Sequence, residues 1–166
     1  MQVLVMSDTH GDSQVIEKVR GFYPNAAAMI HCGDSELPFS HTALEGLKKV
    51  RGNCDLESAF PNETVFNVDG VTFFVTHGHL FNVKTSVLSL SYRAKELGAQ
   101  IACFGHSHVL GAEMIDDILF INPGSLLKPR GRKEKSFAVI EIHDHQFQVT
   151  LFTDENDCIS SHNFTR

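Results

Sequence analysis

Side chains that bind metal ions gather in five short segments of this sequence, and each segment follows a run of apolar residues. The segments supply carboxylates, an amide oxygen and imidazoles. A single histidine at a strand end is more often a hydrogen-bonded structural residue than a ligand, but the ordered set favours a metal site. In chain order the segments are Asp8-Thr9-His10, Gly33-Asp34, Gly52-Asn53-Cys54-Asp55, His77-Gly78-His79 and Gly105-His106-Ser107-His108.

The apolar runs in front of these segments are predicted to be strands. An α/β sheet presents the loops after its strands at one carboxyl edge, so strands ending here would bring the ligands to one rim. Glycine in the loops permits sharp turns and close approach to a ligand. Buried strands are expected at 3–6, 26–30 and 101–104, and a hairpin of strands at 64–68 and 71–76 around Asp69-Gly70.

Helices and further hairpins complete the expected elements. Asp12 or Ser13 is expected to cap a helix whose apolar residues recur at helical spacing. A second helix is expected over 86–97, with Gly98 at its C-terminal end. Two more hairpins are expected at 112–121 and 137–152.

The order of these elements predicts the fold class. Strand–helix–strand units come first and paired strands later, which indicates an α/β (α+β) layered sandwich with mixed sheets. The chain has 166 residues, of which 42% are hydrophobic and 20% charged, with no internal repeat and no linker. We therefore expect a single globular domain, 1–166.

Charge and composition exclude several classes of protein. The 14 positive and 20 negative side chains give a formal charge of −6, which disfavours bulk binding of nucleic acid. No apolar stretch reaches the roughly 20 residues that span a bilayer. The sequence starts without the features of a signal peptide, and its 4 cysteines form no C-x-x-C pair. We expect free thiols and a cytoplasmic location.

The ordered segments resemble the motif series of the calcineurin-like metallophosphoesterases. The compact length and the segment Asn122-Pro123-Gly124-Ser125 are similar to the small single-domain phosphodiesterases of that superfamily, which include the retromer scaffold subunit as a non-enzymatic relative. The resemblance runs from Asp8 to about Ser125. It implies a four-layer αββα sandwich of two mixed sheets that holds two metal ions at the sheet edge.

Carried over to this sequence, the resemblance implies a set of metal ligands. It makes Asp8, His10 and His108 ligands of the first ion, assigns Asn53, His77 and His106 to the second, and lets Asp34 bridge both. A mixed oxygen and nitrogen set without thiolate suits Mn, with Fe, Ni or Zn as alternatives, better than Ca²⁺.

The same set gives a chemical reason for a phosphate-ester substrate. Two divalent cations outweigh the two carboxylates, which leaves a cationic pocket in an acidic protein. Two such ions would supply a hydroxide derived from water, and in-line attack of that hydroxide on phosphorus would expel the leaving group. The substrate expected is a small phosphate ester.

One position departs from the superfamily pattern. Many members have a histidine after the motif asparagine that is thought to protonate the leaving group, whereas this chain has Cys54 followed by Asp55. A thiol is a poor substitute for imidazole as a general acid. We hypothesise weak leaving-group protonation and a preference for aryl or nucleotide diesters. His79 is the alternative acid, or a hydrogen-bonding neighbour of the ligands, and Asp55 orients Asn53 or Cys54 or caps a turn.

A basic segment follows the last motif. Lys128, Arg130 and three further cations lie between 128 and 135. If this loop borders the metal rim, Arg130 or Lys128 would hold the remote half of a diester; otherwise the segment is a solvated hairpin loop.

Three functions remain open from the sequence. A phosphodiesterase is favoured because the chain lacks large insertions that cap a substrate and fills all seven ligand positions. The alternatives are a phosphomonoesterase or nucleotide phosphatase, and a non-catalytic interaction scaffold on the same fold. No membrane partner is expected, and the protein is expected to be a monomer or a homodimer, the latter allowed if Phe22, Phe39, Phe60 and Phe81 are exposed.

Overall fold

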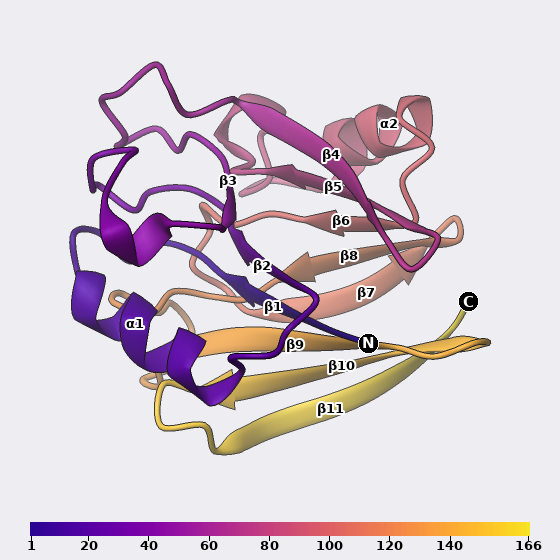
Figure 1. The fold of residues 1–166 in the computed structure, drawn as a ribbon. Helices are drawn as coiled ribbons and strands as arrows, with labels where there is room; N and C mark the ends of the chain where they lie inside the picture. Colours follow the sequence, from indigo (N-terminus) through magenta and orange to yellow (C-terminus); the bar gives the residue numbers. More distant parts are fainter.

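Two β-sheets packed face to face form the centre of the structure, a computed structural model that describes residues 1–166 (Figure 1). The strands of the first sheet are β1 (Gln2–Met6), β2 (Ala28–His31), β3 (Lys48–Lys49), β9 (Ser136–Ile142), β10 (Gln146–Thr153) and β11 (Cys158–Thr165). Those of the second are β4 (Glu63–Val68), β5 (Val71–Thr76), β6 (Ile101–Cys103), β7 (Gly111–Ile115) and β8 (Ile118–Asn122). The helices are α1 (Ser13–Phe22) and α2 (Leu88–Glu96), with 3-10 turns η1 (Thr42–Leu44) and η2 (His79–Phe81).

Both sheets are mixed. The first has the order β11-β10-β9-β1-β2-β3, in which β1, β2 and β3 run parallel and the remaining pairs antiparallel. The second has the order β4-β5-β6-β8-β7, in which β5, β6 and β8 run parallel. The carboxyl ends of β1, β2, β3, β5 and β6 therefore carry the loops that contain the predicted ligands.

Alternation along β1 explains how the first sheet is covered on both faces. Val3 and Val5 belong to the core between the sheets, and Leu4 and Met6 face the other way, into the core beneath α1. Successive side chains of a strand point to opposite faces, so a continuous apolar run marks a strand buried on both sides. Helix α1 supplies Val15, Ile16 and Val19 to its own core and begins at the N-cap Asp12, whose side chain accepts from the Val15 amide.

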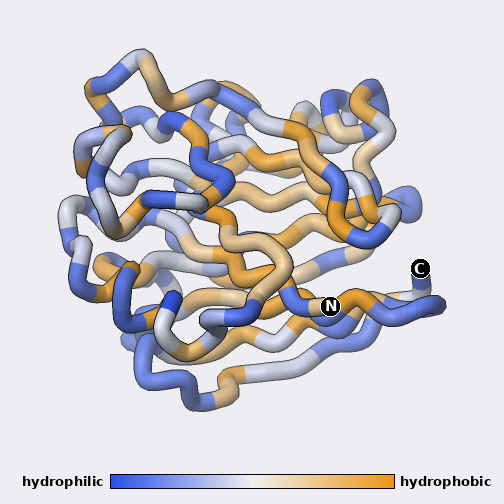
Figure 2. The backbone as a smooth tube through the Cα atoms, viewed as in Figure 1, coloured by the Kyte–Doolittle hydropathy of each residue, from blue (hydrophilic) through white to orange (hydrophobic).

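The second sheet repeats this arrangement. Phe73 and Val75 of β5 face the core between the sheets, and Phe74 faces Leu90 and Ala94 of α2. Helix, sheet, sheet and helix therefore form four layers, which confirms the predicted αββα sandwich. Figure 2 shows hydrophobic residues concentrated along the inner strands and hydrophilic ones in many of the loops.

The predicted elements begin and end within two residues of the observed ones, and one strand was not predicted. β2 begins at Ala28 rather than at residue 26, and α2 spans Leu88–Glu96 rather than 86–97, with Gly98 at positive φ behind it. β11 was not predicted. It is an edge strand with mostly exposed, polar residues, so it lacks the apolar run that marks the inner strands.

The phenylalanines proposed for an exposed surface are not all exposed. Phe60 is 3% exposed and packs edge-on against Phe39, with ring centroids 5.0 Å apart. The prediction of exposure is therefore wrong for Phe60, which completes the core beneath α1, whereas Phe22 is 36% exposed. Neither helix is long and apolar enough to cross a membrane.

Candidate metal centre

Asp8, at the end of β1, is the buried centre of the site. Its side chain is fully buried, and its Oδ2 accepts hydrogen bonds from the Ser7 hydroxyl at 2.6 Å and the His106 amide at 3.1 Å. Its Oδ1 has no hydrogen-bond partner, yet lies 3.1 Å from His108 Nε2 and 3.6 Å from His10 Nε2. A buried carboxylate oxygen that accepts no hydrogen bond and faces imidazole nitrogens is suited to binding a metal cation together with them.

The two histidines beside Asp8 are oriented through their far ring nitrogens. His108 Nδ1 bonds to the Lys128 carbonyl at 2.7 Å, and His10 Nδ1 to Glu36 Oε1 at 2.5 Å. Because a carbonyl can only accept, His108 carries its proton on Nδ1 and keeps a free lone pair on Nε2. The two Nε2 atoms lie 3.3 Å apart and face Asp8 together. This is the geometry by which outer hydrogen bonds fix imidazole ligands.

A second group forms around His77 at the end of β5. Its Nδ1 donates to the Cys32 carbonyl at 2.7 Å, and its Nε2 lies 3.2 Å from Asp34 Oδ2 and 3.1 Å from Asn53 Oδ1. The same Nε2 is 3.8 Å from Asp8 Oδ1, so the two groups are contiguous. Asp8 is the carboxylate common to both groups, and the bridging role assigned to Asp34 stays a prediction.

His106 completes the set from the loop after β6. Its ring centroid is 5.1 Å from that of His77. The residues above Asp8 and His77 enclose a space of about 190 Å³, called here the metal cavity. It is lined by His10, Asp34, Asn53, Cys54, Lys84, His106, His108, Lys128 and Arg130. The structure thus brings all seven predicted ligands together.

The backbone of this site is strained. Residues other than glycine rarely adopt positive φ, and histidine or aspartate there costs about 1–2 kcal/mol each. Such conformations persist where the surroundings fix them, and they cluster at functional sites. The ligands with positive φ are Asp8 (54°), His10 (43°), Asp34 (55°), His106 (69°) and His108 (59°).

Two glycines allow the loops to approach the carboxylates. A Cβ atom at Gly52 would collide with the Asp34 carboxylate and amide, and one at Gly105 with the Ser7 hydroxyl and the Asp8 carboxylate. Each carboxylate therefore packs directly against the backbone of a glycine, and any residue with a Cβ atom at either position would collide with it.

The charges of the site are balanced by protons on its imidazoles. The nearby Asp8 carboxylate, opposed by burial and helped by Glu36, raises the pKa of His10 to about 9. Burial opposes protonation of His77, but its bond to Asp34 raises the pKa above its usual value. Burial and the charge on His77 lower the pKa of His106 to about 4. His10 and His77 thus hold protons that a metal ion would displace.

Asp55 ties the ligand loops together. It is 4% exposed, and its Oδ2 accepts from the amides of Asp34 at 2.8 Å and Gly52 at 2.7 Å, while its Oδ1 accepts from the Glu36 amide at 2.9 Å. It forms no hydrogen bond with the side chain of Asn53 or Cys54, and both of its oxygens bind backbone amides instead. Asp55 positions the backbone of two loops.

Cys54 and His79, the two candidates for the general acid, lie on different sides of Asn53. Cys54 lines the metal cavity, and burial together with the Asp34 charge raises its pKa to about 11. His79 lines a separate space of about 350 Å³ with Asn53 and Asp55, and its Nδ1 is buried without a partner. Its ring centroid lies 5.4 Å from that of His77, so it adjoins a ligand without facing the metal cavity.

Two residues of the site were missed by the sequence analysis. Glu36 orients His10, and its place two residues after Asp34 is a signal that was available. Lys84 lines the metal cavity from the turn after η2, where no motif marks it. The basic segment does border the rim, since Lys128 and Arg130 line the cavity too.

Comparisons with known proteins agree with this geometry. A family model described as the calcineurin-like phosphoesterase superfamily domain matches residues 1–145. The chain is 40% identical over 153 residues to the probable metallophosphoesterase YsnB of Bacillus subtilis (strain 168), covering 92% of this chain and 90% of that protein. It is 30% identical over 144 residues to the phosphodiesterase MJ0936 of Methanocaldococcus jannaschii, covering 75% and 83%. The crystal structure of a predicted phosphoesterase from Streptococcus pneumoniae TIGR4 superposes with a TM-score of 0.95 at 38% identity, covering 99% and 97%.

Proposed function

The chain belongs to the calcineurin-like phosphoesterase superfamily, and from that membership we propose that it is a phosphodiesterase that works with two divalent metal ions, Mn²⁺ first among them. The observation that carries the proposal is the orphaned Asp8 Oδ1, which is fully buried and faces the imidazoles of His10 and His108. Such a network holds a cation without a large rearrangement.

The metal residues have a defined role in this proposal. Asp8, His10 and His108 would hold one ion, and Asn53, His77 and His106 the other, with Asp34 between them. When bound, the ions would supply a hydroxide nucleophile at neutral pH and the positive charge that stabilises the phosphorus transition state.

The cationic rim supports a phosphate ester as the substrate. Lys84, Lys128 and Arg130 line the metal cavity, and their charges attract non-bridging phosphate oxygens. Lys128 contributes to the site in two ways, because it lines the cavity and its carbonyl also orients the His108 ring. Arg130 Nη and Nε atoms suit bidentate binding to phosphate, so we assign the rim to holding and orienting the substrate.

The surroundings of the metal cavity favour a diester over a monoester. A groove of about 500 Å³ adjoins it and shares Lys84, and a cleft of about 300 Å³ adjoins it and shares Cys54. A diester carries two organic groups, one on each side of its phosphorus, and the two spaces match that shape. A monoester would leave one of them unused.

The leaving group departs largely without help in this proposal. The thiol of Cys54 keeps its proton at neutral pH and is a weak acid, since its pKa is about 11. The expected substrates are therefore aryl or nucleotide diesters. A series of aryl diesters that differ in leaving-group pKa should show a steep fall in rate as that pKa rises, and a flat series would contradict the role given to Cys54.

Hydrolysis and metal content test the function together. We expect the protein to hydrolyse an activated diester with Mn²⁺, and Asp34→Asn and His106→Ala to lower kcat at least ~1,000-fold. His162→Ala, in the exposed strand β11, is the control and should leave the rate unchanged. A panel of diesters, monoesters and nucleotides with Mn²⁺, Fe²⁺, Ni²⁺ and Zn²⁺ would identify metal and substrate.

Stoichiometric metal without hydrolysis of any ester would instead indicate a scaffold. The cytoplasmic location and the oligomeric state stay predictions.

A further inference from the structure

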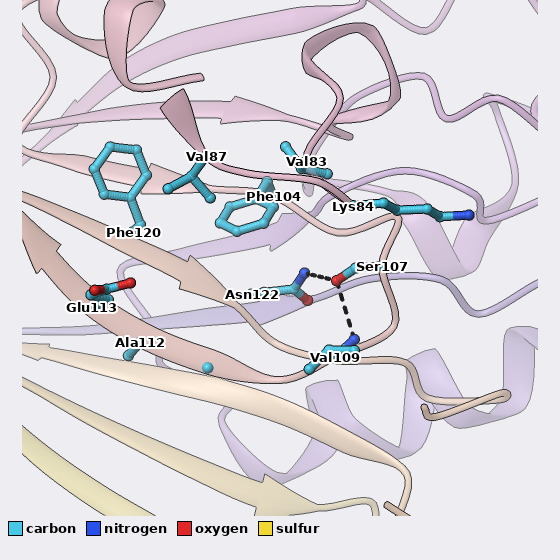
Figure 3. A pocket seen from close by; sticks show the side chains of 11 residues that line it. Val83, Lys84, Val87, Phe104, Ser107, Val109, Ala112, Glu113, Phe120 and Asn122 are labelled. Atoms are coloured by element: carbon cyan, nitrogen blue, oxygen red, sulfur yellow. Dashed lines mark hydrogen bonds between the residues drawn. The ribbon is translucent and has the colours of Figure 1, made fainter. Parts of the chain in front are cut away.

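An apolar groove lies beside the metal cavity, between the turn that precedes α2 and the hairpin of β7 and β8 (Figure 3). Its volume of about 500 Å³ exceeds that of the metal cavity. The proposed reaction uses none of its side chains except Lys84. The apolar lining consists of Val83, Val87, Phe104, Val109, Ala112 and Phe120.

The middle of the groove offers few free polar groups, because Asn122 and Ser107 bond to each other and to the backbone. Asn122 Nδ2 donates to the Gly105 carbonyl at 3.1 Å and to the Ser107 hydroxyl at 2.9 Å, and its Oδ1 accepts from the Gly124 amide at 2.9 Å. The Ser107 hydroxyl also accepts from the Val109 amide at 3.3 Å. Hydrophobic contact is therefore what the middle of the groove offers.

The two ends of the groove carry opposite charges that form no ion pair. Figure 3 places Lys84 at one end and Glu113 at the other. Neither side chain makes a hydrogen bond or salt bridge within the chain, unlike Lys95, which pairs with Asp116. Lys84 lines both the groove and the metal cavity, so it marks their junction.

We propose that this groove binds a flat aromatic ring of the phosphate ester, with Lys84 contacting a phosphate oxygen at the junction. The inference rests on the proposed function and specifies its substrate class. The rings of Phe104 and Phe120 and the branched side chains of Val87 and Val109 form a surface suited to an aromatic face. An ester with only small alkyl groups would leave this apolar surface exposed to water.

Glu113 distinguishes between two sources of such a ring. Its carboxylate can accept hydrogen bonds but cannot donate them, and it repels a second anion. A nucleobase presents amino or ring N–H donors at its edge, whereas a plain aryl group has none. The charges at the two ends therefore match a ligand with phosphate at one end and N–H donors at the other, which is the pattern of a nucleotide.

Binding of non-hydrolysable phosphonates isolates the groove from turnover. Isothermal titration of the Mn²⁺-loaded protein should give a Kd for phenylphosphonate at least ~10-fold below that for methylphosphonate. Hexylphosphonate tests whether any apolar chain suffices, and equal affinity for it and phenylphosphonate would overturn the aromatic assignment. The non-hydrolysable phosphonate analogue of adenosine 5′-monophosphate tests the N–H donors, and it should lose affinity in Glu113→Ala while phenylphosphonate does not.

A groove variant and a matched control test the residues. Val87→Asn with Val109→Asn should weaken phenylphosphonate about 10-fold and leave methylphosphonate within about twofold. Both changes are compatible with folding, because Val109 is 50% exposed and Val87 is the N-cap of α2, where asparagine is favourable. Val65→Asn, at an exposed position of β4, should change neither affinity.

Failure of the groove and failure of the phosphodiesterase are separate outcomes. Equal losses for both phosphonates in the double variant, or no loss at all, would overturn the groove even if diesters are hydrolysed. If the protein binds phenylphosphonate more tightly than methylphosphonate but hydrolyses no diester, the groove proposal stands and the phosphodiesterase proposal is overturned. Lys84→Ala should weaken every phosphonate, and unchanged binding would remove Lys84 from the junction.

Discussion

Asp69, Asp116 and Asp117 adopt positive φ in exposed hairpin turns, and several candidate metal ligands adopt the same backbone conformation at the opposite end of the strands. At the hairpin end, the turn residues Asp69 and Gly70 have φ of 51° and 79°, which a two-residue turn requires. At the ligand end, Asp8 and His108 have φ of 54° and 59° although neither lies in a hydrogen-bonded turn. The same conformation therefore has a local cause at one end of the strands and a tertiary cause at the other.

The difference lies in what compensates the strain. In the hairpins, aspartate and glycine tolerate the left-handed region, and the turns are open to water. At the ligand end, buried hydrogen bonds from distant segments hold the backbone, including the Asp8 amide to the Gly33 carbonyl at 3.0 Å and the His10 amide to the Asp34 carbonyl at 3.0 Å. The ligand end should therefore respond to single substitutions far more strongly than the hairpin end.

The largest effect on stability is expected from Asp55→Ala. It removes the acceptor of three backbone amides, two of which are buried, and should lower the free energy of unfolding by about 3 kcal/mol or more. Asn67→Ala removes the acceptor of one exposed turn amide, that of Gly70, and should cost about 1 kcal/mol. Urea denaturation measures the free energy of unfolding of both variants. Equal losses would contradict the claim that the ligand end responds more strongly than the hairpin end.

A pH dependence is expected next, from His31 at the end of β2. Burial lowers the pKa of His31 to about 4, and the ring stays neutral between the Gly33 amide and the Thr9 hydroxyl. The unfolded chain binds this proton near pH 6.5, so between pH 6.5 and 4 it holds more protons than the folded chain. The free energy of unfolding should fall by about 3 kcal/mol as pH drops through that window.

His31→Gln isolates this contribution. Glutamine offers an acceptor and a donor without titrating, so the part of the pH slope between 6.5 and 4 that belongs to His31 should vanish, whatever the absolute stability of the variant. Denaturation curves at several pH values measure the slope. An unchanged slope would assign the acid sensitivity to other groups.

A smaller effect is expected from Glu36→Gln. The Glu36 carboxylate bonds to His10 Nδ1, which orients the ring and makes Nε2 a stronger metal ligand, so the neutral amide should weaken metal binding about 10-fold. Glu57→Gln is the control, because Glu57 accepts from the Phe39 amide and does not touch a ligand. Chelator competition measures both affinities. Equal affinities in the two variants would show that the link between Glu36 and His10 has no influence on the metal.

The smallest effect is expected from Asp117→Gly in the hairpin of β7 and β8. Glycine relieves the strain at φ 62° but adds freedom to the unfolded chain, so the two terms nearly cancel. The free energy of unfolding should change by no more than about 0.5 kcal/mol in thermal or urea denaturation. A larger loss would mean that this turn has a tertiary role of the kind found at the ligand end.

The sequence by itself predicted most of the elements and the cluster of candidate metal ligands. The run from Val3 to Met6 predicts a strand covered on both faces, and Asp69-Gly70 predicts a hairpin. These signals are local, because alternation and turn chemistry depend on neighbours in the chain. The ligands were also predictable, since each follows a strand and the carboxyl ends of parallel strands meet at one edge.

Tertiary structure alone decided how the site is held and what surrounds it. Asp55 binds amides 19–21 residues away, and Lys84 reaches the metal cavity from a turn without a motif. The apolar groove combines side chains of three separate segments, which are ordinary core residues in the sequence. β11 was missed because a polar edge strand carries no apolar run. Contacts between distant segments leave no periodic signal in the chain, because their partners are chosen by packing of the whole molecule.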